Sequence, residues 1–316
     1  MSKKIAFLFP GQGSQAVGML DAFKNDSQFS ALYEELTASA DAALGENLSG
    51  LIANGPAESL NLTTHTQPAM LLADVLCFQA WTHLGGPQPA MMAGHSLGEY
   101  AALVASGVFS LQDGVKLVRA RANAMQNAVP VGQGGMAAIL GLTDAQVIEA
   151  CSKASATGEV AEAVNFNAPS QVVIAGSAKG IELACQFAKE LGAKRALPLA
   201  VSAPFHSSLM KPASVELKKV LDAVQFASAK SSVYNNIDVL VEAEASKIKD
   251  ALVRQAYGPV RWVESIQKMA ADGAELFVEC GAGKVLTGMV KRIVDVPVLN
   301  ISDPESARSV FETLAS

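Results

Sequence analysis

The chain has 316 residues, of which 50% are hydrophobic and 17% charged, so it can bury the core of one large domain or of two unequal ones. Its formal net charge of −6 argues against a nucleic-acid-binding protein, because such proteins usually carry an excess of Lys and Arg that neutralises phosphates. An anionic partner must therefore meet a local basic patch.

The four cysteines are scattered, with no C-x-x-C pair and no Cys/His cluster, so we expect buried thiols, no metal site, no disulfide and no redox cofactor. The apolar run at 5–9 ends at Pro10 and is too short for a signal peptide. No stretch of about 18 uncharged apolar residues is long enough for a membrane helix. We expect a soluble cytoplasmic protein with no membrane partner, and nothing in the sequence demands more than a monomer.

Strand-like and helix-like segments alternate along the chain, which favours an α/β fold with a parallel sheet. The expected elements of the first part are a strand at 4–9, helical pieces within 17–54, a helix at 67–83, a strand at 90–93 and helices at 97–106 and 110–128. Pro68 would lie where the first turn of a helix tolerates proline. Ser110 and Asp113 have the spacing of a capping box.

The segment PVGQGG at 130–135 has the composition of a linker, and a different pattern follows it. The expected elements are strands at 135–142, 159–166, 171–175 and 194–201 and helices at 144–154 and 179–191. Their β-α-β-β-α-β order is typical of a ferredoxin-like unit. We therefore predict a small ferredoxin-like domain at 130–201, inserted into a large α/β-hydrolase-like domain formed by 1–129 and 202–316. Further strands are expected near 233–236, 275–279 and 297–301.

The loop GQGSQA at 11–16 fits the G-x-G-x-x-G/A pattern of dinucleotide-binding turns. That motif requires a second strand that ends in an acidic residue roughly 20 positions further on. Glu34 and Glu35 lie at about that distance, but the segment 29–44 has few β-branched residues and is typical of a helix. We therefore expect no nucleotide site, and on its own the loop would be a glycine turn at a strand end.

Ser96 lies in the most informative stretch, AMMAGHSLGEY at 90–100. The pattern Gly94-x-Ser96-x-Gly98 between a buried strand and a helix is the context of a nucleophile elbow. The two glycines omit side chains where a sharp turn would make them collide. Ser96 would then project at a helix N-terminus, where free N–H groups and the helix dipole stabilise negative charge. A lone G-x-S-x-G pattern usually marks only a turn, but the flanking strand and helix favour a serine nucleophile.

A serine nucleophile needs a base, and the chain has four histidines. His95 adjoins Ser96, and neighbouring side chains on a tight turn point apart. His65 precedes the expected helix start, and His83 would lie in the last turn of that helix, where it suits the dipole. His206 lies where the inserted domain returns to the large one. Because clefts between domains are common ligand sites, His206 is the best candidate, although a loop histidine alone is more often structural.

Five stretches can be compared with known families: FPGQGSQ at 9–15, GHSLGEY at 94–100, Arg121 with Met125 and Gln126 beyond it, SAPFHS at 202–207 and GKVLTG at 283–288. Together they resemble the malonyl-CoA:acyl carrier protein transacylases of dissociated fatty acid synthesis. The resemblance spans almost the whole chain, including the inserted unit. One departure is Ala282, because the family usually has proline between the two glycines there.

The resemblance implies a transfer of the malonyl group from malonyl-CoA to the phosphopantetheine thiol of acyl carrier protein. Ser96 would form a malonyl ester, and His206 would take the serine proton and return one to the CoA thiol. The backbone N–H of Leu97, the residue after the nucleophile, would be one oxyanion donor. The backbone of Gln12 would provide the other. CoA thioester is then a substrate, and no cofactor is expected.

Arg121 is implied as the clamp for the malonyl carboxylate, because a guanidinium can bind both carboxylate oxygens. From the residues alone, Arg119 and Arg121 would both be solvated charges on a helix. The resemblance also implies that a main-chain carbonyl near Gln255 orients the imidazole, whereas by itself Gln255 would be a helix-surface amide. Basic clusters that would suit an acidic carrier protein are Lys189, Lys194 and Arg195, and Lys284, Lys291 and Arg292. Each cluster alone is more often a solvated face.

Two alternatives remain open at this point. An acyl-CoA thioesterase or esterase of the α/β-hydrolase type would follow the order Ser, acid, His. It would need neither a carboxylate-binding arginine nor the inserted unit. A noncatalytic carrier-protein binding module would keep the fold and form no acyl-serine.

Overall fold

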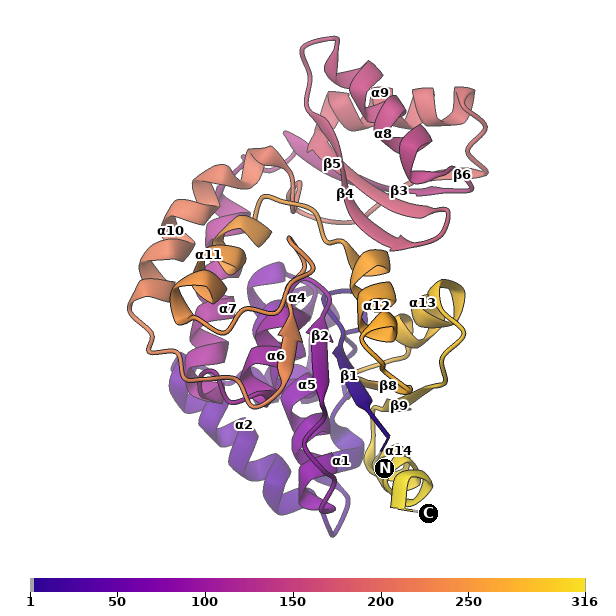
Figure 1. Ribbon diagram of the computed structural model, residues 1–316. Coiled ribbons are helices and arrows are strands. Elements are labelled where there is room, and N and C mark those ends of the chain that lie inside the picture. Colours follow the sequence, from indigo (N-terminus) through magenta and orange to yellow (C-terminus); the bar gives the residue numbers. More distant parts are fainter. Residues whose placement is uncertain (1–2, 316) are drawn as a thin grey trace.

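A five-stranded parallel sheet forms the centre of the larger part of the molecule (Figure 1). The computed structural model describes residues 3–315. The strand order is β7-β2-β1-β8-β9, and each neighbouring pair is parallel. The strands are β1 (Ile5–Phe9), β2 (Met91–Gly94), β7 (Ser232–Tyr234), β8 (Leu276–Cys280) and β9 (Val298–Ile301). The predicted α/β fold with a parallel sheet is confirmed.

Helices cover both faces of this sheet, which explains why β1 is apolar throughout instead of alternating. The helices of this part are α1 (Asp21–Lys24), α2 (Ser30–Leu44), α3 (Leu48–Asn54), α4 (Ala57–Leu60), α5 (Thr63–His83), α6 (Gly98–Ala105), α7 (Leu111–Asn127), α10 (Lys211–Asp222), α11 (Ala245–Gln255), α12 (Trp262–Ala271), α13 (Val285–Ile293) and α14 (Pro304–Ala315), with a 3-10 turn at Ser208–Met210. Phe7 packs on Phe78 and Trp81 of α5. Ala6 and Leu8 belong to the core on the other face, with residues of α12 and α13.

A second sheet has four antiparallel strands in the order β4-β5-β3-β6 and lies apart from the first (Figure 1). Its elements are β3 (Gly134–Leu140), α8 (Asp144–Ser155), β4 (Ala161–Ala168), β5 (Gln171–Ser177), α9 (Ala178–Glu190) and β6 (Arg195–Pro198). They follow one another in the order that the sequence predicts, with strand ends shifted by a few residues. The two helices and the sheet enclose a separate hydrophobic core, to which Ile139, Val147 and Ile181 contribute.

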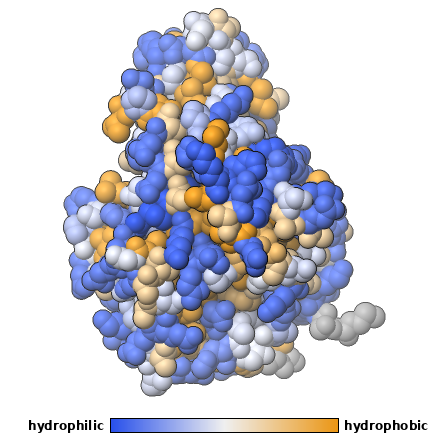
Figure 2. Space-filling view, turned by 90° about the vertical axis from the view of Figure 1, so that its left-hand side faces the viewer, coloured by the Kyte–Doolittle hydropathy of each residue, from blue (hydrophilic) through white to orange (hydrophobic). Residues whose placement is uncertain are grey.

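Backbone hydrogen bonds join the second sheet to the larger part. The Val260 N–H donates to the Val164 carbonyl at 2.8 Å, and the Phe166 N–H donates to the Val260 carbonyl at 3.0 Å. The Glu162 carboxylate also accepts from the Ser208 N–H at 2.7 Å. Figure 2 shows a narrower upper lobe on a broader lower one, with hydrophobic residues near the centre of this face. The two parts therefore meet along a defined seam.

The start of α5 differs from the prediction, and Pro68 shows why this matters. The helix begins at Thr63, so Pro68 lies inside it and not in its first turn. Proline has no N–H, so the Thr64 carbonyl lacks the usual helical donor. Arg119 replaces that donor, with its Nε 2.7 Å from the Thr64 oxygen, and its Nη1 donates to Glu46 at 2.8 Å. The interpretation of Arg119 as a solvated charge was therefore wrong.

The chain after the GQGSQA loop contains helices where a nucleotide-binding unit would have a strand. Glu34 and Glu35 lie in α2, and the next strand along the chain is β2. The prediction that the dinucleotide motif lacks its second strand is confirmed.

The predicted strand at 233–236 was too long, because β7 ends at Tyr234 and leaves Asn236 beyond the sheet.

The four cysteines, Cys77, Cys151, Cys185 and Cys280, are free and buried, as the sequence predicts. Within residues 3–315, no helix combines the length and the apolar character that crossing a membrane requires. The same residues contain no cluster of His, Cys, Asp and Glu that could hold a metal ion.

Candidate active site

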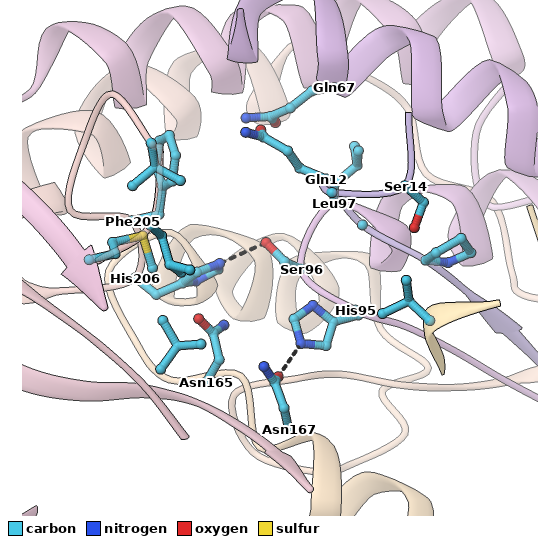
Figure 3. Close-up of a pocket in the computed structure, with 18 of the residues that line it drawn as sticks. Gln12, Ser14, Gln67, His95, Ser96, Leu97, Asn165, Asn167, Phe205 and His206 are labelled. Atoms are coloured by element: carbon cyan, nitrogen blue, oxygen red, sulfur yellow. Dashed lines mark hydrogen bonds between the residues drawn. The ribbon is translucent and has the colours of Figure 1, made fainter. Parts of the chain in front are cut away.

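A cavity of ≈ 260 Å³ lies between the two parts of the molecule (Figure 3). Gln12 and Ser96 line it from the larger part, and Met136 of β3 and Val173 of β5 line it from the second sheet. The lining is largely apolar, with a few polar side chains that converge on Ser96. Ligand sites usually have this composition.

Ser96 occupies a strained turn between β2 and α6, with a φ of 53°. A Cβ atom on Gly94 would lie 1.8 Å from the Gly98 carbonyl carbon, and one on Gly98 would lie 2.0 Å from the Phe9 oxygen. The predicted reason, a collision within the turn, is confirmed for Gly94, whereas Gly98 is required by the close approach of β1. Asn236 holds the turn, because its Oδ1 accepts from the Ser96 N–H and its Nδ2 donates to the Gly94 carbonyl, both at 2.7 Å.

His206 meets Ser96 across the cavity, with 2.7 Å between Ser96 Oγ and His206 Nε2 (Figure 3). The Nδ1 atom lies 2.9 Å from the backbone carbonyl oxygen of Gln255. Since a carbonyl only accepts, Nδ1 carries the proton, and the neutral imidazole presents a bare Nε2 to the serine hydroxyl. The structure thus brings together two residues 110 positions apart in the sequence.

Burial keeps this imidazole neutral. Burial, followed by the positive charge of Arg121, lowers the pKa of His206 from 6.5 to about 3. A neutral imidazole can accept the serine proton at physiological pH.

The same shift predicts how stability depends on pH. Between pH 6.5 and about 3 the unfolded chain binds a proton at His206 that the folded chain does not. The stability that the neutral histidine contributes is therefore present above pH 6.5 and is lost as the pH falls. Between pH 7.5 and pH 5 we expect a loss of about 2 kcal/mol that the variant His206→Gln does not show. Urea unfolding of both proteins at the two pH values measures the difference, and an equal loss in both would contradict the assignment.

Arg121 is buried, at 2% exposure, and its guanidinium points at the nucleophile. Its Nη2 lies 3.0 Å from Ser96 Oγ and 3.0 Å from Gln255 Oε1, and its Nη1 lies 2.7 Å from Gln67 Oε1. Its Nε has no partner among the described residues. The guanidinium lies over the Tyr100 ring, 5.6 Å from the ring centre. This is a buried cation that can still bind an anion entering the cavity.

Two residues that the sequence did not single out extend this network along α5. Gln67 Nε2 donates to Thr63 Oγ1 at 3.0 Å, and Thr63 Oγ1 donates to Gln12 Oε1 at 2.9 Å. The chain of contacts runs from Arg121 through Gln67 and Thr63 to the first glycine loop. The sequence contains one signal for these two residues: Thr63 and Gln67 are polar and lie one turn apart on a helix that is otherwise mostly apolar and buried.

Two backbone N–H groups at the cavity are free to stabilise an oxyanion. Leu97 and Gln12 both line the cavity, and neither N–H has an acceptor within residues 3–315. The Ser96 N–H is already bound by Asn236. Gly11 lets the first loop approach the elbow closely, because a Cβ atom there would lie 2.6 Å from the His95 carbonyl oxygen. Two unpaired backbone donors thus belong to residues that line the same cavity as Ser96.

The other histidines have different partners. His95 Nε2 lies 2.7 Å from Asn167 Oδ1, and Figure 3 shows it on the opposite side of Ser96 from His206. His65 lies in the first turn of α5, and not before it as predicted, with its Nδ1 2.9 Å from the Ser59 carbonyl oxygen. His83 is in the last turn of α5, as predicted.

Gln255 is fully buried, so the interpretation as a helix-surface amide was wrong. Its backbone carbonyl accepts from His206, and its side chain contacts Arg121, Ser96 and Glu99. Sequence reasoning missed Glu99, although it belongs to the GHSLGEY stretch. It also missed Asn236, which no local pattern marks.

Comparison with known proteins places the chain among acyltransferases. A family model described as "Acyl transferase domain" matches residues 6–310. The chain is 52% identical over 313 residues to the malonyl CoA-acyl carrier protein transacylase of Salmonella typhimurium, covering 98% of this chain and 99% of that protein.

Solved structures give the same result. The acyl-carrier-protein S-malonyltransferase of Burkholderia pseudomallei superposes with a TM-score of 0.95 at 57% identity, covering 98% of this chain and 99% of that one. A malonyl-transacylase in complex with a type II PKS acyl-carrier protein superposes with a TM-score of 0.95 at 44% identity, covering 98% and 100%.

Proposed function

The chain belongs to the acyl transferase domain family, and from this we propose that it transfers a malonyl group from malonyl-CoA to the phosphopantetheine thiol of an acyl carrier protein. The transfer supplies malonyl-carrier protein for fatty acid synthesis and passes through an ester on Ser96. One observation carries the proposal: Ser96 Oγ lies within hydrogen-bond distance of both His206 and Arg121. A nucleophile, a base and a carboxylate-binding cation thus share one cavity.

In the first half-reaction, Ser96 Oγ attacks the thioester carbon of malonyl-CoA and forms a C–O bond. His206 Nε2 takes the hydroxyl proton, and the N–H groups of Leu97 and Gln12 stabilise the oxyanion. When the tetrahedral intermediate collapses, the C–S bond breaks. The proton passes from His206 to the departing CoA sulfur. The Gln255 carbonyl keeps the imidazole in the required tautomer and stabilises its positive charge during the transfer.

In the second half-reaction, the carrier-protein thiol attacks the ester carbon and gives its proton to His206. A new C–S bond forms, the C–O bond to Ser96 breaks, and the proton returns to the serine oxygen. The sequence is a ping-pong acyl transfer.

Arg121 selects the acyl group. A planar guanidinium binds both oxygens of a carboxylate, which malonyl has and acetyl lacks. Without a carboxylate, Nη2 donates to the lone pair of Ser96 Oγ and lowers its nucleophilicity. A malonyl carboxylate competes for this donor, so binding of the correct substrate also releases the nucleophile.

The two alternatives explain fewer observations. A hydrolase of the Ser, acid, His order orients its histidine with a carboxylate, whereas His206 Nδ1 donates to a backbone carbonyl. A noncatalytic binding module has no need for a serine at 2.7 Å from a neutral histidine. Neither alternative accounts for the buried guanidinium of Arg121 beside Ser96.

We regard residues 130–201 as a ferredoxin-like domain that closes the cavity over Ser96. Its β3 and β5 provide Met136 and Val173 to the wall. The exposed Lys194 and Arg195 on this domain, and Lys284 and Lys291 at α13, are available to an acidic carrier protein. Arg292 is partly engaged, because its Nη2 donates to the Pro169 carbonyl at 2.6 Å.

Intact-mass measurement tests the function directly. After incubation with malonyl-CoA we expect one malonyl group per chain, discharged faster by carrier protein than by water. The control variant Ser96→Ala should form no adduct. An adduct that water removes as fast as carrier protein would indicate a thioesterase, and no adduct on the unmodified chain would indicate a binding module.

A further inference from the structure

Glu99 lies directly behind the nucleophile and is excluded from the substrate cavity. It is in the first turn of α6, is 2% exposed, and is not among the described residues that line the large cavity. Its carboxylate therefore has no route to substrate. A buried acid in this position requires partners, and the identity of these partners indicates what it does.

The Glu99 Oε2 atom accepts two hydrogen bonds, from the Asn236 N–H at 2.9 Å and from Gln255 Nε2 at 2.8 Å. Because Oε2 acts as an acceptor, it requires the amide of Gln255 to present its NH2 group and not its oxygen. The Ser96 carbonyl oxygen, 2.9 Å from the same Nε2, makes the same demand. The amide of Gln255 thus has one orientation and not two.

This orientation directs Gln255 Oε1 at Arg121, where it lies 3.0 Å from Nη2. If the amide were inverted, its NH2 group would face the guanidinium, and two donors would oppose each other. The guanidinium nitrogen held by Gln255 is the one that also contacts Ser96 Oγ. The position of the carboxylate clamp relative to the nucleophile therefore depends on the direction of the Gln255 amide.

From these contacts we propose that Glu99 is a positioning residue for acyl-group selection: it orients the Gln255 side chain, which in turn holds the Arg121 guanidinium beside Ser96. The proposal rests on the proposed malonyl transfer. It assigns the side chain of Gln255 a role separate from that of its backbone carbonyl, which faces His206.

The charge environment agrees with this role. Burial raises the pKa of Glu99, the hydrogen bonds from Gln255 and Asn236 and the charge of Arg121 oppose this, and the resulting pKa is about 7. Glu99 is thus a buried acid whose donors are the same groups that hold the elbow and the clamp.

The test compares kcat/KM for malonyl-CoA with kcat/KM for acetyl-CoA, because an effect on Ser96 itself cancels in this ratio. Glu99→Leu removes the acceptor, and Gln255→Leu removes the amide while keeping the backbone carbonyl. We expect both to lower the malonyl preference about tenfold or more, the size of effect that follows from a lost hydrogen bond to a charged group. Glu99→Gln keeps an acceptor oxygen and should keep the preference within about threefold of the unmodified protein.

Asp74→Asn is the matched control, because Asp74 is equally buried in α5 and neither of its carboxyl oxygens has a hydrogen-bond partner in the described residues. It should leave the preference unchanged. An unchanged preference in Glu99→Leu would overturn the proposal. Acetylation of Ser96 shows whether Glu99→Leu is folded. If it is not, the proposal requires that the malonyl preference falls in Gln255→Leu and persists in Glu99→Gln. Any other pair of results overturns the proposal. Failure of the unmodified chain to form a malonyl-serine would instead contradict the proposed function.

Discussion

Replacing His206 with alanine is expected to slow the acylation of Ser96 by malonyl-CoA on the order of 10⁴-fold, the upper end of what a general base contributes. No other described residue is positioned to replace it, because His95 on the other side of the serine is bound to Asn167. Some reaction should persist, since the variant keeps the proposed oxyanion donors, the backbone N–H groups of Leu97 and Gln12. Rapid-quench sampling followed by intact-mass measurement gives the acylation rate.

The histidine at the end of α5 is the matched control for this experiment. His83 is exposed, packs near the Phe29 ring with 5.7 Å between ring centres, and is not among the described residues that line the cavity. His83→Ala should acylate at the unmodified rate within about twofold, as surface substitutions normally have small effects. A His206→Ala protein with undiminished acylation would remove the base from the mechanism.

Replacing Arg121 with alanine is expected to reduce the preference for malonyl over acetyl about 10- to 150-fold, the range that corresponds to 1.5 to 3 kcal/mol for a hydrogen bond to a charged group. The malonyl carboxylate would then be buried without a partner, whereas an acetyl group loses no contact. Acetylation should also benefit, because Nη2 no longer donates to Ser96 Oγ. Measuring kcat/KM for both thioesters separates these effects.

Arg119 provides the comparison for Arg121, two positions away on the same helix. Its guanidinium bonds the Thr64 carbonyl and Glu46, outside the cavity. Arg119→Ala should lower the free energy of unfolding and leave the malonyl preference intact, since it removes a structural contact only. Arg121→Lys keeps the charge and loses the planar fork, so an intermediate preference is expected. Full preference in Arg121→Ala would refute the clamp.

Local signals were sufficient for the strands of the two sheets and for the turn that presents Ser96. The collision that requires Gly94 lies inside the turn, with the backbone of Gly98, whereas the collision that requires Gly98 is with Phe9 of the neighbouring strand β1. Ser110 is another local feature: its side chain accepts from the Asp113 N–H, but the Asp113 carboxylate accepts from the Ser110 hydroxyl and not from its N–H, so only half of the predicted capping box forms. Patterns of this kind depend on neighbours along the chain, and such neighbours are visible in a single sequence.

The start of α5 shows where local signals fail. Pro68 at the sixth position of a helix is locally unfavourable, so the sequence placed the helix start too late. The missing hydrogen bond is replaced from α7, by Arg119, 55 positions away. The hydrogen bond from Arg119 reduces the free-energy cost of a proline inside the helix. No short stretch of the sequence contains both Pro68 and Arg119.

The sequence by itself determined the α/β order, the strained corner that presents Ser96, and the choice of His206 among four histidines. Tertiary structure alone decided which polar side chains support them. Gln255 meets Ser96 from 159 positions away and Asn236 from 140, and no local pattern along the chain distinguishes either from a surface polar residue. Their role follows from burial and from the direction of each donor and acceptor, which exist only once the helices have packed around the sheet.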